Sequence, residues 1–141
     1  MGSSSGGMAT LGVLIDHPEI TAGGVALYPV SDAAALAGAT HRFEAHYNYS
    51  LIGPDGDHRY AERSMVGRAA SITQPVLLMH GTHDPVVPVE QSRVMRQTLE
   101  NNGVPVEYVE FDGEGHGFRQ PESRHREYEL VGAFLSRIAA G

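Results

Sequence analysis

Cysteine is absent from the sequence, so disulfide bonds, thiolate nucleophiles and thiolate metal ligands are excluded. Long hydrophobic runs are absent as well. No apolar stretch approaches the roughly 20 residues that a membrane-spanning helix needs, and we therefore expect no membrane partner. The N-terminus also lacks the basic segment and the apolar stretch of a signal peptide, which favours a cytoplasmic location.

Basic residues are in the minority. The chain has 10 Lys and Arg against 17 Asp and Glu, which gives a net charge of −7. No basic block is present to neutralise phosphates, and this argues against a nucleic-acid partner. The 41% of hydrophobic and 19% of charged residues are typical of a soluble globular protein. The length of 141 residues is that of a single domain.

Hydrophobic periodicity and chain breakers predict strands that alternate with helices. Such alternation is typical of an α/β fold with a mainly parallel sheet flanked by helices, in which ligands bind at the carboxyl ends of the strands. Only three strands are evident, fewer than the about five or more of a typical doubly wound sheet. The predicted helices are 8–15, one or two within 33–50, a weaker one within 60–72, 89–102 and 122–139, and the predicted strands are 25–30, 76–80 and 104–111.

Polar residues that carry chemistry follow two of these strands. Asp84 lies in "HGTHDPVVP", directly after strand 76–80, and His116 lies in "DGEGHGF", directly after strand 104–111. At the start of the chain, "MGSSSGG" has two interpretations. Its composition is that of an expression-tag remnant, but it also places Ser4 at the centre of a G-x-S-x-G pattern. We favour the second interpretation, a strand-to-helix turn, because a helix follows at once and matching acid and histidine loops lie downstream.

Ser4, Asp84 and His116 then have the chain order of an α/β-hydrolase and converge at one edge of the sheet. A serine hydroxyl is a poor nucleophile until a base removes its proton, and histidine titrates near neutral pH, so His116 is the expected base. Asp84 would orient the imidazole. The backbone N–H of Ser5 would donate to the oxyanion. The tight turn would need glycine at both ends of the G-x-S-x-G pattern, Gly2 and Gly6.

Other candidates have simpler explanations. Asp32 is a rival for the acid, but an aspartate that opens a loop is more often a turn or cap residue, and Asp112 is likewise interpreted as a turn residue. His80, at the end of a strand, is interpreted as a structural histidine. A metal site would combine His80, His83, Asp84 and His116, but these residues lack any fixed-spacing signature, so we expect neither a metal nor another cofactor.

The stretches "GSSSGG", "PVLLMHGTHDPVVP" and "GEGHGF" together resemble the C-terminal part of the peptidase domain of the prolyl oligopeptidase family. The resemblance extends over nearly the whole chain. It implies an α/β-hydrolase fold in which Ser4 is the nucleophile, Asp84 the acid and His116 the base. It also implies a serine-type peptidase that acts on short peptides or acyl-peptides. The aromatic run 41–49 would be a packed helix face, or would lie near the substrate.

The chain departs from the family pattern by beginning at the nucleophile turn. We therefore expect residues 1–141 to form a partial catalytic domain, the C-terminal half of an α/β-hydrolase with about three to four strands. The strand before Ser4, the earlier strands, any β-propeller and the second oxyanion donor would be missing. Segment 24–30 would then be an exposed sheet edge that favours self-association. Two alternatives stay open: a non-catalytic fragment, and an esterase of the same fold.

Overall fold

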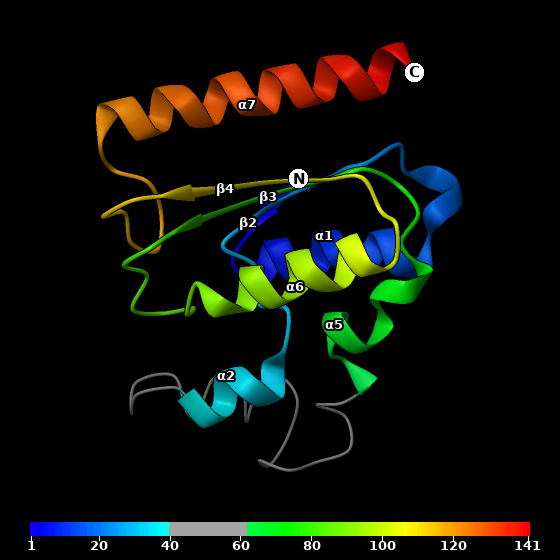
Figure 1. Ribbon diagram of the computed structural model, residues 1–141, viewed down its shortest axis with the longest axis horizontal. Helices are drawn as coiled ribbons and strands as arrows, with labels where there is room; N and C mark the ends of the chain where they lie inside the picture. Colours follow the sequence, from blue (N-terminus) through cyan, green and yellow to red (C-terminus); the bar gives the residue numbers. More distant parts are fainter. Residues whose placement is uncertain (40–61) are drawn as a thin grey trace.

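The computed structural model describes residues 1–39 and 62–141. In this part of the chain a four-stranded parallel sheet, in the order β1-β2-β3-β4, lies between helices (Figure 1). In chain order the elements are β1 (Gly2–Ser3), α1 (Ser5–Asp16), η1 (Pro18–Ile20), β2 (Gly24–Leu27), α2 (Ala33–Ala39), α5 (Met65–Arg68), η2 (Ala69–Ser71), β3 (Val76–Gly81), α6 (Glu90–Asn101), β4 (Val106–Phe111) and α7 (Pro121–Ala140).

Helices cover both faces of the sheet. α7 lies over one face, whereas α1 and α6 lie side by side on the other (Figure 1). The core is accordingly divided into two clusters. Leu14 of α1 and Met95 of α6 belong to the cluster on one face, and Phe134 of α7 belongs to the cluster on the other. This is the predicted α/β class.

Strand β3 forms the centre of the sheet, and all its residues are buried. Successive side chains of a strand point to opposite faces, so Val76 and Leu78 contact the α1/α6 layer while Leu77 and Met79 contact the α7 layer. A strand buried on both faces has no polar side to alternate with its apolar one. This explains why 76–80 is a continuous apolar run in the sequence.

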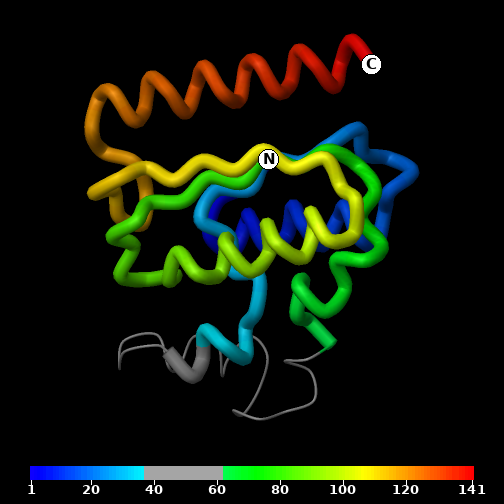
Figure 2. The backbone as a smooth tube through the Cα atoms, viewed as in Figure 1, coloured from blue at the N-terminus to red at the C-terminus, as the bar shows by residue number. Residues whose placement is uncertain are grey.

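The connections between neighbouring strands all contain helices. Parallel strands cannot be joined by a tight turn, and the chain returns from the end of each strand to the start of the next (Figure 2). The predicted helix 89–102 is confirmed as α6. It ends before Gly103, whose φ of +75° is of the kind that favours glycine after a helix. The described part of segment 60–72, from residue 62, contains the two short helices α5 and η2 rather than one longer helix.

One prediction about the sheet edge is wrong. The strand before Ser4 is present as the two residues of β1, which pair with β2 through Gly2 opposite Ala26 and Ser3 opposite Leu27. Segment 24–30 is therefore not the edge, and β1 is the outermost strand of the described sheet. A two-residue strand is too short to produce a periodic pattern, which is why the sequence did not reveal it.

Strand β2 is also shorter than predicted and ends at Leu27. Tyr28 has a φ of +37°, which turns the backbone out of the extended conformation. Among the described helices, none is long and apolar enough to cross a membrane. A second helix in 33–50, the aromatic run 41–49 and the beginning of the 60–72 helix lie outside the described residues.

Candidate active site

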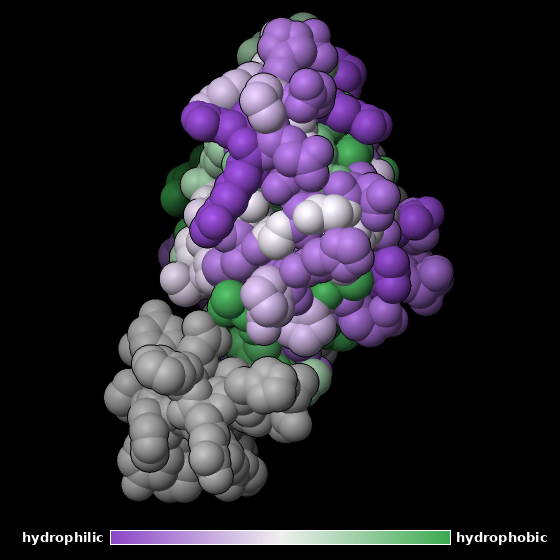
Figure 3. All heavy atoms as spheres, turned by 90° about the vertical axis from the view of Figure 1, so that its left-hand side faces the viewer, coloured by the Kyte–Doolittle hydropathy of each residue, from purple (hydrophilic) through white to green (hydrophobic). Residues whose placement is uncertain are grey.

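The three predicted site residues come from three separate connections that meet at the carboxyl edge of the sheet. Ser4 lies between β1 and α1, Asp84 follows β3, and His116 follows β4. The arrowheads of β3 and β4 point to the left-hand side of Figure 1. That side faces the viewer in Figure 3, where its surface is mainly hydrophilic with smaller hydrophobic areas.

Ser4 occupies a strained turn between a strand and a helix. Its φ is +53° and its ψ −119°, a conformation that L side chains rarely adopt. The turn is held by the backbone N–H of Ser4, which donates to the carbonyl oxygen of Leu27 at 2.9 Å. Ser5 is the first residue of α1, so its N–H has no acceptor within the helix. The binding of an oxyanion by this N–H stays a prediction.

The turn requires glycine at Gly2, as predicted, and at Gly7 in place of the predicted Gly6. A Cβ at Gly2 would lie 2.1 Å from the carbonyl oxygen of Gly6, so only glycine fits there. A Cβ at Gly6 itself would meet nothing within 4 Å, and the predicted reason for that glycine is wrong. The second close approach is at Gly7, where a Cβ would lie 2.8 Å from Pro29. Packing of α1 against the segment after β2 was not visible in the G-x-S-x-G pattern.

Ser4, His116 and Asp84 form a continuous hydrogen-bonded series. Ser4 Oγ lies 2.9 Å from His116 Nε2, and His116 Nδ1 lies 2.8 Å from Asp84 Oδ2. An ionised carboxylate only accepts hydrogen bonds, so Nδ1 carries the proton and Nε2 is free to accept from the serine hydroxyl. The Asp84 side chain is fully buried, whereas that of His116 is 23% exposed. The imidazole is thus oriented by a buried carboxylate while part of its side chain remains exposed to solvent.

A tight loop keeps Asp84 ionised. Its Oδ1 accepts from the backbone N–H groups of Val86 and Val87 at 2.8 and 2.9 Å. Burial by itself would raise the pKa of Asp84, but the hydrogen bonds from His116, His80, Val87 and Val86 outweigh it and hold the pKa well below its usual range. A permanent negative charge therefore faces the Nδ1 side of His116.

His80 is a buried structural residue that also reaches Asp84. Its ring is fully buried, with Nε2 2.9 Å from the carbonyl oxygen of Val87 and Nδ1 2.7 Å from Ser92 Oγ. A carbonyl only accepts, so Nε2 carries a proton, and the same nitrogen lies 3.3 Å from Asp84 Oδ2. His80 thus links α6 to the loop that holds Asp84. The position of His80 at a strand end did not reveal this contact.

Replacing His80 by alanine is expected to lower the free energy of unfolding by about 2–4 kcal/mol. The change removes a buried ring together with its hydrogen bonds to Ser92 Oγ and to the carbonyl oxygen of Val87. Urea denaturation measures the effect, and the exposed His83 is the matched control, because its replacement by alanine should change the free energy by less than about 0.5 kcal/mol. Equal effects of the two substitutions would contradict the structural role of His80.

The loop that carries His116 is closed by a buried carboxylate missed in the sequence. Glu114 accepts from the backbone N–H groups of Arg119 and Gln120, both at 2.9 Å. Burial would raise the pKa of Glu114, but these two hydrogen bonds contribute most to a net lowering. The side chain therefore ties the His116 loop to the start of α7. The sequence signal that could have pointed to Glu114 is its place in "GEGHGF", two residues before His116.

The rival residues have the local roles that were expected of them. Asp32 Oδ1 accepts from the backbone N–H groups of Ala34 and Ala35 at 3.0 and 3.1 Å and so caps α2. Asp112 lies in the turn after β4, and its Oδ1 accepts from Oγ1 of Thr82, which directly follows β3. In the described residues, no group of three or more His, Asp or Glu side chains is arranged to hold a metal ion.

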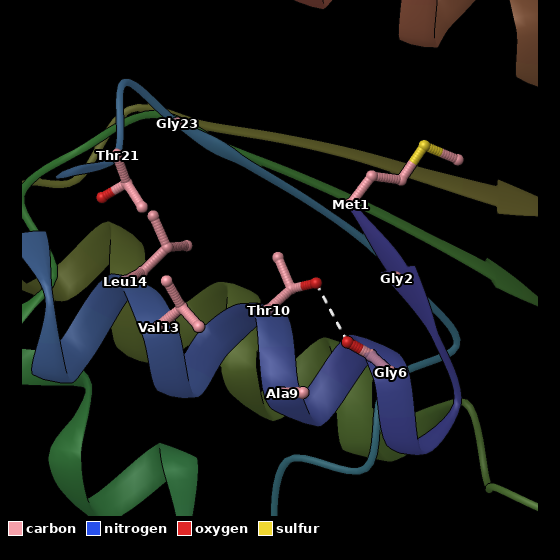
Figure 4. Close-up of a pocket in the computed structure, with 9 residues that line it drawn as sticks. All are labelled: Met1, Gly2, Gly6, Ala9, Thr10, Val13, Leu14, Thr21 and Gly23. Atoms are coloured by element: carbon pink, nitrogen blue, oxygen red, sulfur yellow. Dashed lines mark hydrogen bonds between the residues drawn. The ribbon is translucent and has the colours of Figure 1, made fainter.

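A separate open groove of about 400 Å³ lies beside the nucleophile turn. Met1 and Gly2 border it on one side, and Gly6, Thr10 and Leu14 of α1 border it on the other (Figure 4). Thr10 Oγ1 donates to the carbonyl oxygen of Gly6 at 2.9 Å within this wall. None of the three site side chains lines the groove, which extends from Met1 and Gly2 over α1 to Thr21 and Gly23.

Comparison with known proteins agrees with this architecture. Dipeptidyl aminopeptidase BIII of Pseudoxanthomonas mexicana is 32% identical over 148 residues, which covers 100% of this chain and 22% of that protein. Dipeptidyl peptidase family member 6 of Caenorhabditis elegans is 29% identical over 149 residues, covering 100% of this chain and 20% of that protein. The structure of a puromycin-hydrolyzing peptidase of Mycobacterium tuberculosis has a TM-score of 0.93 and 37% identity, covering 97% of this chain and 21% of that one.

This chain thus spans about a fifth of the length of these relatives. The model of the prolyl oligopeptidase family matches residues 1–141. The resemblance noted in the sequence is confirmed, and the chain belongs to the prolyl oligopeptidase family.

Proposed function

We propose that this chain supplies the nucleophile, the base and the acid of a serine peptidase, with Ser4, His116 and Asp84 in these roles. The observation that carries the proposal is the pair of hydrogen bonds at His116, 2.9 Å to Ser4 Oγ and 2.8 Å to Asp84 Oδ2. Membership of the prolyl oligopeptidase family supports it.

In the first half of the reaction, Ser4 Oγ attacks the carbonyl carbon of the substrate while His116 Nε2 takes the hydroxyl proton. Asp84 stabilises the imidazolium that results. The backbone N–H of Ser5, at the N-terminus of α1, donates to the oxyanion. His116 then gives its proton to the leaving amine, the C–N bond breaks, and an acyl ester remains on Ser4.

In the second half, water takes the place of the amine. His116 removes a proton from the water as its oxygen attacks the acyl carbon, and then returns that proton to Ser4 Oγ as the ester bond breaks. The products are the free acid and the regenerated serine. The 23% exposure of the His116 side chain is consistent with a base that water must reach.

Short peptides or acyl-peptides are the proposed substrates. The names of two relatives, a dipeptidyl aminopeptidase and a puromycin-hydrolyzing peptidase, support a substrate of this class. The same acyl-enzyme chemistry also cleaves esters, so an esterase is the second outcome that an experiment must separate.

A fluorophosphonate probe tests the proposal, because it reacts fast only with an activated serine. We expect labelling at a single site, located at Ser4 by peptide mass spectrometry and absent when the chain is unfolded in urea. Labelling no faster in the folded than in the unfolded chain would favour a non-catalytic fragment. A p-nitroanilide and a p-nitrophenyl ester of the same acyl group then distinguish a peptidase from an esterase.

We also propose that the chain self-associates through the free edge of β1. Unpaired backbone groups on an outermost strand pair readily with another strand, and the groove beside β1 offers apolar surface for a second copy. The expected result is a molar mass by light scattering that increases with concentration.

A matched pair of lysine substitutions tests this edge. Val13 lines the groove and is 40% exposed, whereas Val94 lies on α6 and is 43% exposed. Val13→Lys should weaken self-association, since it places a charge on the groove surface that a second copy would bury, and Val94→Lys should leave it unchanged. A monodisperse monomer at all concentrations would contradict the proposal.

A further inference from the structure

Tyr28 is held in a strained backbone conformation next to the candidate active site. Its φ of +37° is positive, and in the described chain Ser4 is the only other non-glycine residue with a positive φ. The backbone N–H of Tyr28 donates to the carbonyl oxygen of Met79 at 2.6 Å, which anchors the turn to β3. Such strain persists where the surrounding structure imposes it, most often at functional sites.

The backbone conformation of Tyr28 places its ring against the imidazole of His116. The two ring centroids lie 4.7 Å apart with an interplanar angle of 56°. The ring centroid of Tyr28 also lies 5.7 Å from that of Phe118 and 6.4 Å from that of His80, both in a T-shaped arrangement. An extended residue at position 28 would continue β2 and project its side chain in another direction. The ring is therefore placed against the imidazole by the turn itself.

The hydrogen bonds of His116 leave one motion of its ring uncontrolled. Asp84 and Ser4 hold the two ring nitrogens, which lie on either side of Cε1. These two contacts leave the ring able to rock about the line that joins them. Contact with the ring of Tyr28 opposes this rocking. The electron-rich face of an aromatic ring also attracts a cation, and an imidazolium is the cation that the proposed reaction forms.

We propose that Tyr28 is a positioning residue that keeps the imidazole of His116 aligned with Ser4 and stabilises the imidazolium. This inference rests on the proposed function. Among the described residues, the titratable groups that face His116 include Tyr28 itself and Asp84, whose Oδ2 lies 2.8 Å from Nδ1. His80 Nε2 lies 3.3 Å from the same Oδ2, and Glu114 lies on the loop of His116.

The test measures the rate of fluorophosphonate labelling of the chain against pH. Labelling needs the neutral imidazole, so the rate rises with pH. Tyr28→Leu removes the attraction that favours the imidazolium. The rise in labelling rate on the acidic side of the pH profile, the acidic limb, should therefore move to lower pH by about half a unit. The plateau rate should fall about tenfold through lost alignment. Tyr28→Phe keeps the ring and should match the wild type within about twofold.

Tyr28→Asn separates the ring from the backbone strain. Asparagine tolerates a positive φ, so this variant should melt at a higher temperature than Tyr28→Leu and yet show the same move of the acidic limb. An unchanged limb in both ring-free variants would overturn the inference. A move to higher pH would also overturn it, because that is the result expected if the ring only excluded water.

A second measurement does not depend on catalysis. The imidazole NMR signal of His116, identified by its absence in His116→Ala, is followed against pH in the same variants. Its midpoint should move to lower pH in Tyr28→Leu and Tyr28→Asn and stay in place in Tyr28→Phe. A wild-type chain that is not labelled would count against the proposed function, whereas an unmoved NMR midpoint would overturn the role of Tyr28.

Discussion

Replacing Ser4 by alanine is expected to lower the rate of substrate hydrolysis by about 10³- to 10⁶-fold. The substitution removes the only oxygen that His116 Nε2 contacts at 2.9 Å among the described residues, so no acyl-enzyme forms. The fold should be unaffected, since the Ser4 side chain makes no capping hydrogen bond to α1. Initial rates with a p-nitroanilide peptide, together with a melting curve, measure both effects.

The three consecutive serines provide internal controls. Ser3 and Ser5 are exposed, and replacing either by alanine should change the rate by no more than about threefold. Ser5→Ala is the more demanding control, because it keeps the backbone N–H that is proposed to bind the oxyanion. Near-normal turnover in Ser4→Ala, or a large loss in Ser3→Ala, would refute Ser4 as the nucleophile.

Replacing Asp84 by asparagine is expected to lower turnover by about 10⁴-fold at neutral pH. The amide oxygen can still accept from Val86 and Val87, which preserves the loop. The amide nitrogen, however, presents a donor to His116 Nδ1, and the imidazole then adopts the wrong tautomer. Asp32→Asn is the matched control, because asparagine caps a helix as well as aspartate does. Equal losses of turnover in Asp84→Asn and Asp32→Asn would contradict the proposal that Asp84 is the acid of the site.

The pH dependence of stability provides a separate check on Asp84. Its pKa is lowered in the folded protein, so its contribution to stability is fully present above about pH 4 and is lost as the pH falls through that lowered pKa. Between pH 7 and pH 3 the wild type should therefore lose more free energy of unfolding than Asp84→Asn. Urea denaturation at the two pH values measures the difference, and parallel losses would contradict it.

The parts of the fold that were predictable from the sequence are those in which local signals agree. Strand β3 is a continuous apolar run, and α6 has both an amphipathic pattern and a glycine two residues after its end. Asp84 and His116 were predictable for a topological reason, since both directly follow strands that are parallel. Their carboxyl ends must therefore meet at one edge, whatever the details of packing.

The parts that were not predictable depend on contacts between distant segments. β1 is recognised by its pairing with β2 and not by its two residues. The need for glycine at position 7 comes from Pro29, and the positive φ of Tyr28 is imposed by its neighbours. No local pattern reports such contacts, because the same short sequences are compatible with ordinary conformations elsewhere.

The hydrogen bond between His116 and Ser4 joins residues 112 positions apart in the chain. Contacts of such high sequence separation form late in folding, because the entropy of closing a long loop must be offset first. During synthesis the serine therefore emerges long before its base, and it remains an ordinary alcohol until β4 has joined the sheet. Recovery of probe labelling after dilution from urea should accordingly lag behind the recovery of helical circular dichroism, which makes the nucleophile a reporter of the last folding step.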